Sequence, residues 1–371
     1  MTKVLIVSTN SDEAGAPRHI EFLINLLGED INFYCIFGTK GPVSNRIKSK
    51  MPNRVFILGG MQSSISFFKD IFLFFRFIFL VLRIKPDLVH CHSTKAGIYG
   101  RILSIFTKKK ILFTIHGWPW RGFSGWKYNL IVSIERFLMN YSKSHYIGVA
   151  KCLIDEARDV GIEIPPEKIS IIYNTSLISN KTVSNKILNF KNERYFIMPA
   201  RVSSAKDHKK LAMAFDKSDY TGKLLFAGEG TNKIDFINLI TSSMQKKKHN
   251  LKFLGERDDI ANLIFNSEFV ALCSNFETFP LIIPEAARLC KPLILSKVGG
   301  NEEILENNFD ALFASSLDEW TIAINSYCKK DNLNKISKNI KKTFNLKLNP
   351  DKTKKDILKI YKSLKTLDSV K

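Results

Sequence analysis

The stretch SNFETFPLIIPEAARLCKPLILSKVGGNEEI (274–304) contains a turn, the start of a helix and then an apolar strand in direct succession. Its strand, KPLILSKVG (291–299), is one of many short runs rich in Val, Ile, Leu and Phe that alternate with longer helical segments. This alternation is typical of βαβ units around a parallel sheet. The sequence therefore predicts an α/β protein.

The alternating pattern occurs twice along the chain. In the first half the expected strands are KVLIVS (3–8), INFYCIFG (31–38), DLVHCHS (87–93), KILFTIHG (110–117), SHYIGVA (144–150) and ISIIYN (169–174). After a polar stretch at 175–194, the pattern resumes with YFIMPARV (195–202), GKLLFAGEG (222–230), NLKFLGE (250–256) and FVALCS (269–274). We expect two Rossmann-like, doubly wound domains, 1–185 and 190–350, that face a central cleft and bind ligands at the carboxyl ends of their strands.

The formal net charge of the 371 residues is +21, and it is unevenly distributed. Residues 1–195 contribute +13 and residues 329–371 contribute +10, whereas residues 196–328 carry −2. A basic excess favours an anionic partner such as nucleic acid, lipid head groups or a phosphorylated substrate. Its location predicts that the two halves of the chain have different tasks.

The cysteines and the N-terminus indicate the compartment. Six cysteines, at positions 35, 91, 152, 273, 290 and 328, show no Cys-x-x-Cys pair and no regular spacing, so neither a disulfide framework nor a zinc cluster is indicated. The apolar run in MTKVLIVSTN (1–10) is too short for a signal peptide. We expect a protein of a reducing, cytoplasmic compartment.

The most apolar segment is ISFFKDIFLFFRFIFLVLRIKPD (65–87), which charged residues interrupt. Its longest stretch with a single charge, 71–82, would span about 18 Å as a helix, against about 30 Å of hydrocarbon in a bilayer. A basic or polar residue recurs every seven positions and predicts a narrow stripe made of Gln62, Lys69, Arg76 and Arg83. The pattern fits either a helix enclosed in its domain or one that contacts a membrane interface or a partner helix.

Two carboxylates, Glu277 and Glu285, lie eight positions apart across a turn and a helix start. Carboxylates accept strongly from sugar hydroxyls, so one can bind a hexose and the other a ribose, while free amides at the helix N-terminus face a phosphate. A solvated pair on a surface helix is the structural alternative. The pattern Glu-x7-Glu within E-T-F-P…P-E-A…P-L-I…G-G-x-x-E resembles the signature of retaining glycosyltransferase family 4, of the bacterial surface-polysaccharide type, which has the GT-B fold.

Other segments resemble the same family over nearly the whole chain. They are the glycine-rich first loop AGAPRH (14–19), the Asp-x-Val-His-x-His segment PDLVHCHSTKAGIYGR (86–101), the sugar-pocket histidine in IHG (115–117), the hinge IIYNT (171–175), the Gly-Arg-x4-Lys-like ARVSSAK (200–206) and the strand end LFAGEG (225–230). Arg201 and Lys206 lie five positions apart after a strand, which lets both cations converge on one diphosphate.

The resemblance implies a role for each matched residue. The catalytic residues are expected to be His116, Arg201, Lys206 and Glu277. Donor binding is expected of Gly15, Phe279, Pro280, Leu281 and Glu285. In this scheme Glu285 binds the ribose, and Glu277 binds the sugar together with the backbone amides of Phe279, Pro280 and Leu281.

The resemblance also implies an activity. It predicts a retaining, metal-independent glycosyltransferase that moves a hexose or N-acetylhexosamine from a nucleoside diphosphate sugar, a UDP-sugar more than a GDP-sugar, with no further cofactor. The basic first domain favours a polyprenyl-diphosphate-linked oligosaccharide as acceptor, in O-antigen-like surface polysaccharide synthesis at the inner face of the cytoplasmic membrane. A helix at about 352–371 would pack back on the first domain, and Phe74, Phe75 and Phe79 would enter an anionic membrane surface.

Other functions stay open at this point. A sugar-nucleotide epimerase shares the fold, and a non-catalytic protein could bind membrane or nucleic acid, although the basic regions lack the interleaved aromatics of nucleic-acid binders. His90 and His92 alternate on an expected strand and could form a zinc triad with His116, but no carboxylate follows to orient them and no Asp-x-Asp motif is present. No metal site is predicted. His19 is either a surface residue at a helix start or a contact for the acceptor.

Overall fold

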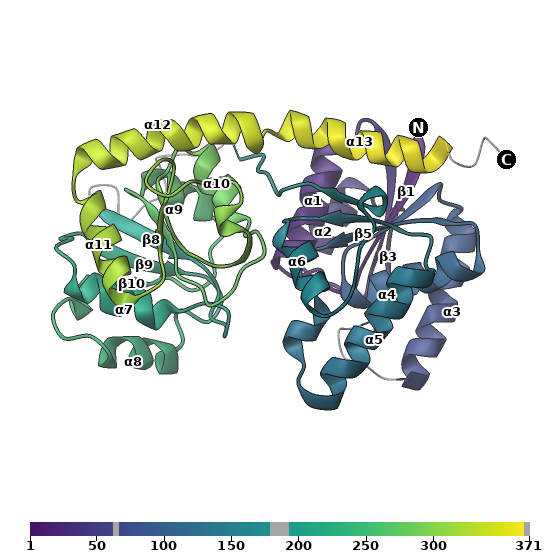
Figure 1. Ribbon diagram of the computed structural model, residues 1–371, viewed down its shortest axis with the longest axis horizontal. Coiled ribbons are helices and arrows are strands. Elements are labelled where there is room, and N and C mark those ends of the chain that lie inside the picture. Colours follow the sequence, from purple (N-terminus) through teal and green to yellow (C-terminus); the bar gives the residue numbers. More distant parts are fainter. Residues whose placement is uncertain (62–66, 179–192, 367–371) are drawn as a thin grey trace. The chain divides into compact units, whose positions relative to one another are not determined.

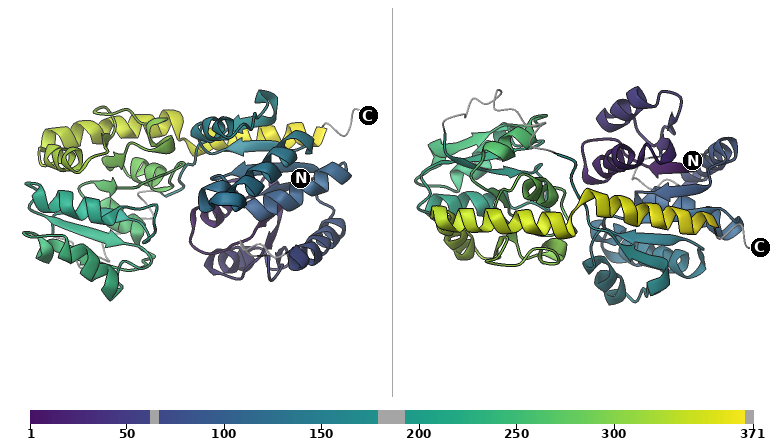
Figure 2. Two further views of the ribbon diagram at one scale, coloured as in Figure 1. Left: turned by 60° about the horizontal axis from the view of Figure 1, so that its bottom comes forward. Right: turned by 90° about the horizontal axis from the view of Figure 1, so that it is seen from above.

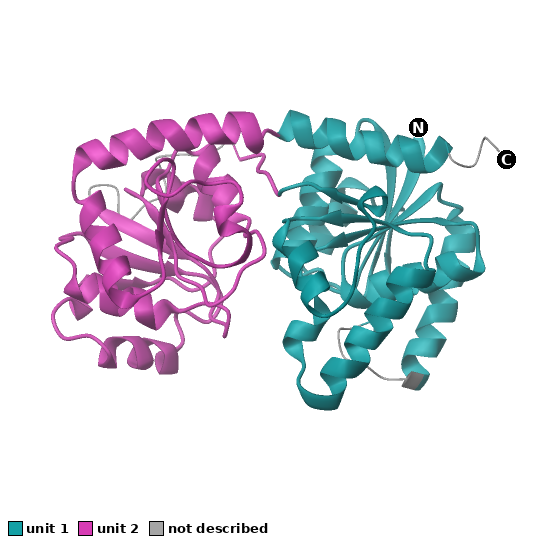
Figure 3. Cartoon of the chain, viewed as in Figure 1, with its two compact units in different colours: residues 1–173, 350–371 teal, residues 174–349 magenta. Residues whose placement is uncertain are grey.

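The computed structural model describes residues 1–61, 67–178 and 193–366. The chain forms two compact units, residues 1–173 with 350–371 and residues 174–349 (Figure 3). The domain boundary expected at 185–190 lies outside the described residues.

The first unit is built on a parallel sheet of seven strands in the order β3-β2-β1-β4-β5-β6-β7 (Figure 1). Its strands are β1 (Thr2–Ser8), β2 (Ile31–Phe37), β3 (Val55–Ile57), β4 (Leu88–Cys91), β5 (Lys110–Ile115), β6 (His145–Gly148) and β7 (Ile169–Ile171). The order reverses between β1 and β4, which makes this point the topological switch where ligands bind in doubly wound sheets.

Helices cover both faces of this sheet. They are α1 (Gly15–Leu27), α2 (Pro42–Lys50), α3 (Phe67–Ile84), α4 (Thr94–Phe106), α5 (Gly125–Tyr141), α6 (Cys152–Asp159) and α13 (Pro350–Thr366), with short 3-10 turns at Pro119–Gly122 and Pro166–Lys168. Although α13 is the last helix of the chain, it lies beside α1 and across the first unit (Figure 2). Its Ile357 and Tyr361 are buried in the core that α1 and α2 share with the sheet.

The second unit repeats the architecture with six parallel strands in the order β10-β9-β8-β11-β12-β13. Its strands are β8 (Tyr195–Pro199), β9 (Lys223–Ala227), β10 (Leu251–Phe253), β11 (Val270–Leu272), β12 (Leu293–Ser296) and β13 (Leu312–Ala314). Its helices are α7 (His208–Lys217), α8 (Ile234–Ser242), α9 (Ile260–Asn266), α10 (Ile282–Arg288), α11 (Leu317–Tyr327) and α12 (Lys330–Lys347), with 3-10 turns at Lys248–Asn250 and Gly299–Glu302. Here the switch lies between β8 and β11.

The expected α/β class and both doubly wound sheets are confirmed, and every strand predicted from the sequence forms. Two further strands, β3 and β13, were not expected. Each has three residues and lies at the end of the strand order of its sheet, as β7 and β10 also do.

The apolar helix α3 has two distinct faces. Its inner face packs Leu73, Phe77, Val81 and Ile84 into the unit. Its outer face carries Phe72, Phe75 and Phe79 at exposures of 62%, 64% and 62%. Phe74, which we expected to face outward as well, is half-buried and packs edge-on against Tyr99 of α4, so that expectation is wrong.

The basic stripe is partly described. Lys69, Arg76 and Arg83 are exposed, each one position after an outward apolar residue, while Gln62 lies outside the described residues. A search of the described helices finds no segment whose length and hydropathy would let it cross a membrane.

Candidate functional site

The second sheet brings its predicted catalytic residues to the switch between β8 and β11. Arg201 follows β8, and Glu277 follows β11. Between them, the backbone of residues 205–207 pairs with that of residues 273–275: Lys206 and Ser274 form an antiparallel bridge, and the Asp207 N–H donates to the Cys273 carbonyl at 2.9 Å. This short ladder places the Lys206 side chain over the loop that carries Glu277.

Lys206 and Glu277 form an ion pair in which the Lys206 ammonium donates to Oε1 of Glu277. The Ser274 hydroxyl donates to the same oxygen at 2.7 Å. Both charged side chains are largely enclosed, with exposures of 16% for Lys206 and 11% for Glu277. Both of these hydrogen bonds end on Oε1. Oε2 of Glu277 receives neither of them, so the carboxylate can accept from a further donor such as a sugar hydroxyl.

The loop that holds Glu277 contacts residues that lie in the matched motif and hinge but received no individual role from the sequence. The Gly300 N–H donates to the Thr278 carbonyl at 2.9 Å, and Gly299 has a φ of +55° with its Cα against the Glu277 carbonyl. A side chain at Gly299 would collide with that backbone, which explains the glycine at this position. The Asn174 side-chain amide donates to the Phe279 carbonyl at 2.8 Å from the other side.

Arg201 is exposed at the end of its strand. The turn after β9 comes so close to it that a Cβ on Gly228 would lie 2.5 Å from the Ala200 carbonyl, and the neighbouring Val202 N–H donates to the Glu229 carbonyl at 2.9 Å. The loops after β8 and β9 therefore support each other. They present the Arg201 guanidinium at the rim of the sheet, where a ligand can reach it.

The predicted donor-binding residues of this unit line the entry to α10. Phe279 is buried, and Pro280 and Leu281 are half-buried immediately before the helix. Pro280 has no backbone N–H, so the expectation that its amide contacts the sugar is wrong on chemical grounds. Its carbonyl instead accepts from the Ile283 N–H at 3.2 Å, which closes the first turn. Glu285 lies within α10 and is 6% exposed.

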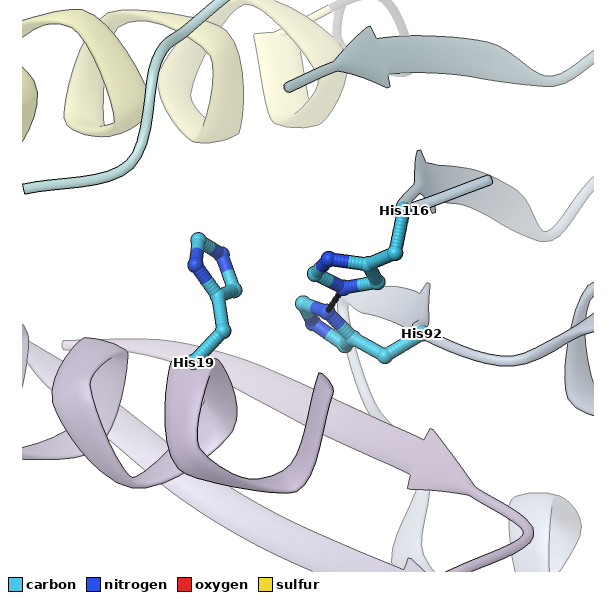
Figure 4. Close-up of side chains that lie close together, drawn as sticks. All are labelled: His19, His92 and His116. Carbon is cyan, nitrogen blue, oxygen red and sulfur yellow. Dashed lines mark hydrogen bonds between the residues drawn. The ribbon is translucent and has the colours of Figure 1, made fainter. Parts of the chain in front are cut away.

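The first unit collects histidines at the carboxyl edge of its sheet. His92 follows β4, His116 follows β5, and His19 lies in α1, which follows β1 (Figure 4). Nδ1 of His92 and Nε2 of His116 are 3.3 Å apart, and the His19 ring lies edge-on to the His116 ring with centroids 5.0 Å apart. His19 and His92 are buried, while His116 is half-buried.

His90 belongs to a different network. Its Nδ1 bonds to the Tyr361 hydroxyl of α13 at 2.8 Å, and its Nε2 bonds to the Thr114 hydroxyl at 2.7 Å. Both ring nitrogens are thus in use. The three-histidine group considered from the sequence, with His90 as a member, does not form. His19, and not His90, lies with His92 and His116. The signal for His19 was its place in the helix that follows the central strand, next to the switch point.

Burial lowers the pKa of three histidines in this part of the first unit. Burial is the main cause that lowers the pKa of His92 and of His116 well below the usual value of 6.5, and the neighbouring histidines lower it further. His90 has its pKa lowered in the same direction and for the same main reason.

Gly15, a predicted donor-binding residue, begins α1, the helix that carries His19. A Cβ built on Gly15 would have no other atom within 4 Å.

Comparison with known proteins identifies the family. Residues 16–175 match Glycosyltransferase Family 4, and residues 179–343 match Glycosyl transferases group 1. The chain belongs to glycosyltransferase family 4. The resemblance inferred from the motifs is confirmed, and the protein is a glycosyltransferase.

The curated relatives of this glycosyltransferase are similar over most of their length. It is 27% identical over 348 residues to an Escherichia coli UDP-Gal:alpha-D-GlcNAc-diphosphoundecaprenol alpha-1,3-galactosyltransferase, covering 88% of each chain. It is 24% identical to the O-antigen biosynthesis glycosyltransferase WbnH of Escherichia coli, covering 83% of this chain and 85% of that one.

Solved structures share the fold of this glycosyltransferase. The Anabaena protein Alr3699/HepE in complex with UDP-glucose superposes with a TM-score of 0.82 at 18% identity, covering 98% of this chain and 100% of that chain. WaaG, a glycosyltransferase involved in lipopolysaccharide biosynthesis, superposes with a TM-score of 0.67 at 11% identity over 96% and 99% of the two chains. The expected GT-B fold is confirmed.

Proposed function

We propose that this glycosyltransferase transfers a hexose or N-acetylhexosamine from a UDP-sugar, with retention of configuration, to a polyprenyl-diphosphate-linked oligosaccharide during surface polysaccharide synthesis. The name of the galactosyltransferase relative supports both the donor and the lipid diphosphate acceptor. The UDP-glucose bound by Alr3699/HepE and the O-antigen role named for WbnH support the same choice.

The observation that carries the proposal is the enclosed group of Lys206, Glu277 and Ser274 at the switch of the second sheet. We assign this unit to the donor. Arg201 and Lys206 would bind the diphosphate, where two fixed cations stabilise the charge that grows on the leaving group. Lys206 would exchange part of its contact with Glu277 for phosphate oxygens, which frees the Glu277 carboxylate to accept from hydroxyls of the sugar.

The other donor contacts follow from the same loop. Glu285 would bind the ribose, and the amides of Phe279 and Leu281 would donate to the sugar or the phosphate. Asn174, Gly299 and Gly300 act as positioning residues because they contact the backbone from the Glu277 carbonyl to the Phe279 carbonyl. A loop fixed in this way costs little reorganisation when the transition state forms.

The first unit is assigned to the acceptor, with Gly15 at its first loop and His116 as its contribution to the transferred sugar. A neutral imidazole suits this task, since it can both donate to and accept from hydroxyl groups. In a front-face mechanism the donor phosphate takes the acceptor proton, so the chain needs no nucleophile and no base of its own. Arg201 and Lys206 supply the positive charge that a metal ion would otherwise provide, which is why we propose metal-independent transfer.

We further propose that the enzyme binds the inner face of the cytoplasmic membrane through an apolar surface of the first unit. The helices α3, α4 and α5 lie side by side in one layer (Figure 1). We call six of their exposed aromatic residues the α3–α5 surface; they are Phe72, Phe75, Phe79, Phe106, Trp126 and Phe137. Lys69, Arg76 and Arg83 border it on α3 and can bind anionic head groups while the aromatic rings enter the lipid.

A donor panel tests the catalytic proposal. The purified chain is incubated with UDP-Gal, UDP-GlcNAc, UDP-glucose and GDP-mannose, each with and without a short-chain polyprenyl-diphosphate GlcNAc acceptor. We expect turnover of a UDP-sugar only when the acceptor is present. Conversion of a donor to its epimer without acceptor would instead identify an epimerase, and turnover with the GDP-sugar alone would refute the choice of donor.

A further inference from the structure

We propose that His19, His92 and His116 form a binding site for a divalent transition metal, with Zn²⁺ as the ion that fits best. Each of the three offers one ring nitrogen, and these nitrogens all lie within 4.8 Å of one another (Figure 4). They come from three separate elements that meet at the switch of the first sheet, so the group is held by the fold and not by one loop.

The distances suit a tetrahedral zinc site. At a Zn–N bond of 2.0–2.1 Å, two nitrogens of one tetrahedron are about 3.4 Å apart. Nδ1 of His92 and Nε2 of His116 are already 3.3 Å apart. No pair has to approach by more than about 1.4 Å, and rotation of the imidazole rings about their broad χ2 torsions shifts the ring nitrogens in this way.

The hydrogen bonds of the neighbouring rings also leave this group available to a metal. His90, the remaining neighbour, is committed to Tyr361 and Thr114 and does not compete. Within the described part of the chain, Nε2 of His92 is buried and has no hydrogen-bond partner, so no acceptor fixes which nitrogen of this ring carries the proton and Nδ1 is free to be the unprotonated one.

Three imidazoles with no carboxylate or thiolate in the group select zinc, copper or nickel over magnesium or calcium, which prefer oxygen ligands. The fourth position of the tetrahedron would be taken by water or by an oxygen of a bound ligand. One consequence rests on the proposed function: a metal that occupies His116 removes this imidazole from the transfer reaction. The ion would therefore inhibit the enzyme and take no part in the metal-independent step.

Cobalt absorption tests the site directly, because Co²⁺ in a tetrahedral field has strong visible bands that octahedral Co²⁺ lacks. Untagged full-length protein is titrated with Co²⁺ and then with Zn²⁺. We expect about one Co²⁺ per chain with visible bands that Zn²⁺ abolishes. His19→Gln and His92→Gln should each weaken Co²⁺ binding by at least about tenfold, as loss of one ligand of three requires.

The matched control is His249→Gln, because His249 is exposed on the second unit. This variant should bind as much Co²⁺ as the wild type. Circular dichroism and the melting temperature show whether each variant folds; if His19→Gln unfolds, His19→Asn and His92→Gln take its place. Visible bands that persist in both histidine variants, a near-ultraviolet cobalt–thiolate band, or no bound Co²⁺ in wild type would each overturn the proposal.

Inhibition separates this inference from the proposed function. Zn²⁺ should inhibit glycosyl transfer by the wild type at the concentrations that displace Co²⁺, and His19→Gln should need at least about tenfold more Zn²⁺ for the same effect. If Co²⁺ binds at the three histidines but Zn²⁺ does not inhibit, the metal site stands and the role assigned to His116 fails. If Zn²⁺ inhibits wild type and His19→Gln equally, the inhibition arises elsewhere and the proposed consequence is wrong.

Discussion

In the second unit, charged side chains collect where β8 and β11 end, whereas in the first unit buried and half-buried histidines collect where β1, β4 and β5 end. Both places are the switch points of doubly wound parallel sheets. The comparison teaches that the same backbone arrangement can serve opposite electrostatic tasks. An enclosed cation beside a carboxylate can bind a diphosphate with a sugar attached. Enclosed imidazole rings can bind hydroxyl groups or a transition-metal ion such as Zn²⁺.

The two edges also differ in how they are stabilised. Lys206 and Glu277 satisfy each other and can exchange partners with a charged ligand. The histidine edge depends on its rings staying neutral, because protonating several buried rings at short distances is costly. Four changes to the protein or its conditions should separate these behaviours.

Acid should destabilise the first unit more than the second. The pKa values of His90, His92 and His116 are lowered in the folded state, so below pH 6.5 the unfolded chain binds more protons and the free energy of unfolding falls as pH falls. At pH 5.5 each such histidine lowers the free energy of unfolding by on the order of 1 kcal/mol, and the three together lower it by a few kcal/mol. In the second unit, His208, whose pKa is lowered to about 4, makes one contribution of the same kind.

Urea unfolding at pH 7.5 and pH 5.5 measures this difference. In a Trp320→Phe variant the remaining three tryptophans, Trp118, Trp120 and Trp126, all belong to the first unit and report its unfolding by fluorescence. His92→Gln should make the pH dependence shallower. A free energy of unfolding for the first unit that is unchanged or higher at pH 5.5 would show that its histidine edge is not held neutral.

Removing the cation from the second edge should abolish most of the activity. Lys206→Ala should lower kcat/KM by about 10³-fold, because a preorganised positive charge at the leaving group is lost and Glu277 keeps its negative charge without its partner. Steady-state kinetics with the true donor measure the change. Lys209→Ala is the matched control, since Lys209 is exposed on the neighbouring α7 and should change kcat/KM less than about twofold. Comparable losses in both variants would argue against a specific role for Lys206.

The two carboxylates should differ in what they bind. Glu277→Gln should lower kcat by about 100-fold and leave the Kd for UDP within about threefold, because its proposed partner is the sugar. Glu285→Gln should raise the Kd for UDP by about tenfold or more through loss of a charged hydrogen bond to the ribose. Isothermal titration with UDP and kinetics with the UDP-sugar distinguish them. If both variants lose UDP affinity equally, the division between sugar and ribose is wrong.

The smallest effect concerns the membrane. Changing Phe72, Phe75 and Phe79 to Ser should reduce sedimentation with anionic phospholipid vesicles by about tenfold, since exposed rings enter lipid at modest free energies. High salt should weaken the wild type further, because it screens the basic residues beside these rings. The control changes Ile234, Leu239 and Ile322, exposed apolar residues of the second unit, to Ser. Wild type that stays in the supernatant at low salt would refute membrane binding.

Much of the fold followed from the sequence because long buried strands leave strong apolar runs, as in KVLIVS (3–8) and KPLILS (291–296). The strands β3 and β13 were missed, whereas β7 and β10, which are equally short and also end their sheets, were predicted, so length and position alone do not decide whether such a strand is visible in the sequence. For α3 the apolar character was clear, yet only the structure divides its faces and shows that Phe74 packs against Tyr99 while Phe75 points outward.

The candidate site was predictable where its residues follow strands in a recognisable motif, as Arg201, Lys206 and Glu277 do. The pairing of Lys206 with Glu277 was not, because a short ladder between residues 205–207 and 273–275 creates it and no sequence pattern marks that ladder. The histidine group was missed for a similar reason. His19 is more than 70 positions from His92 in the sequence and meets it only because β1 and β4 are neighbours in the sheet.

The central claim is that the charged edge of the second unit supports metal-independent transfer with retention. The most direct measurement follows the reaction by proton NMR, using the UDP-sugar found active and a polyprenyl-diphosphate GlcNAc acceptor in the presence of EDTA. The account predicts a disaccharide product whose new bond has the α configuration of the donor, formed at the same rate with and without the chelator. A β-linked product, or a reaction that stops when EDTA is added, would contradict it.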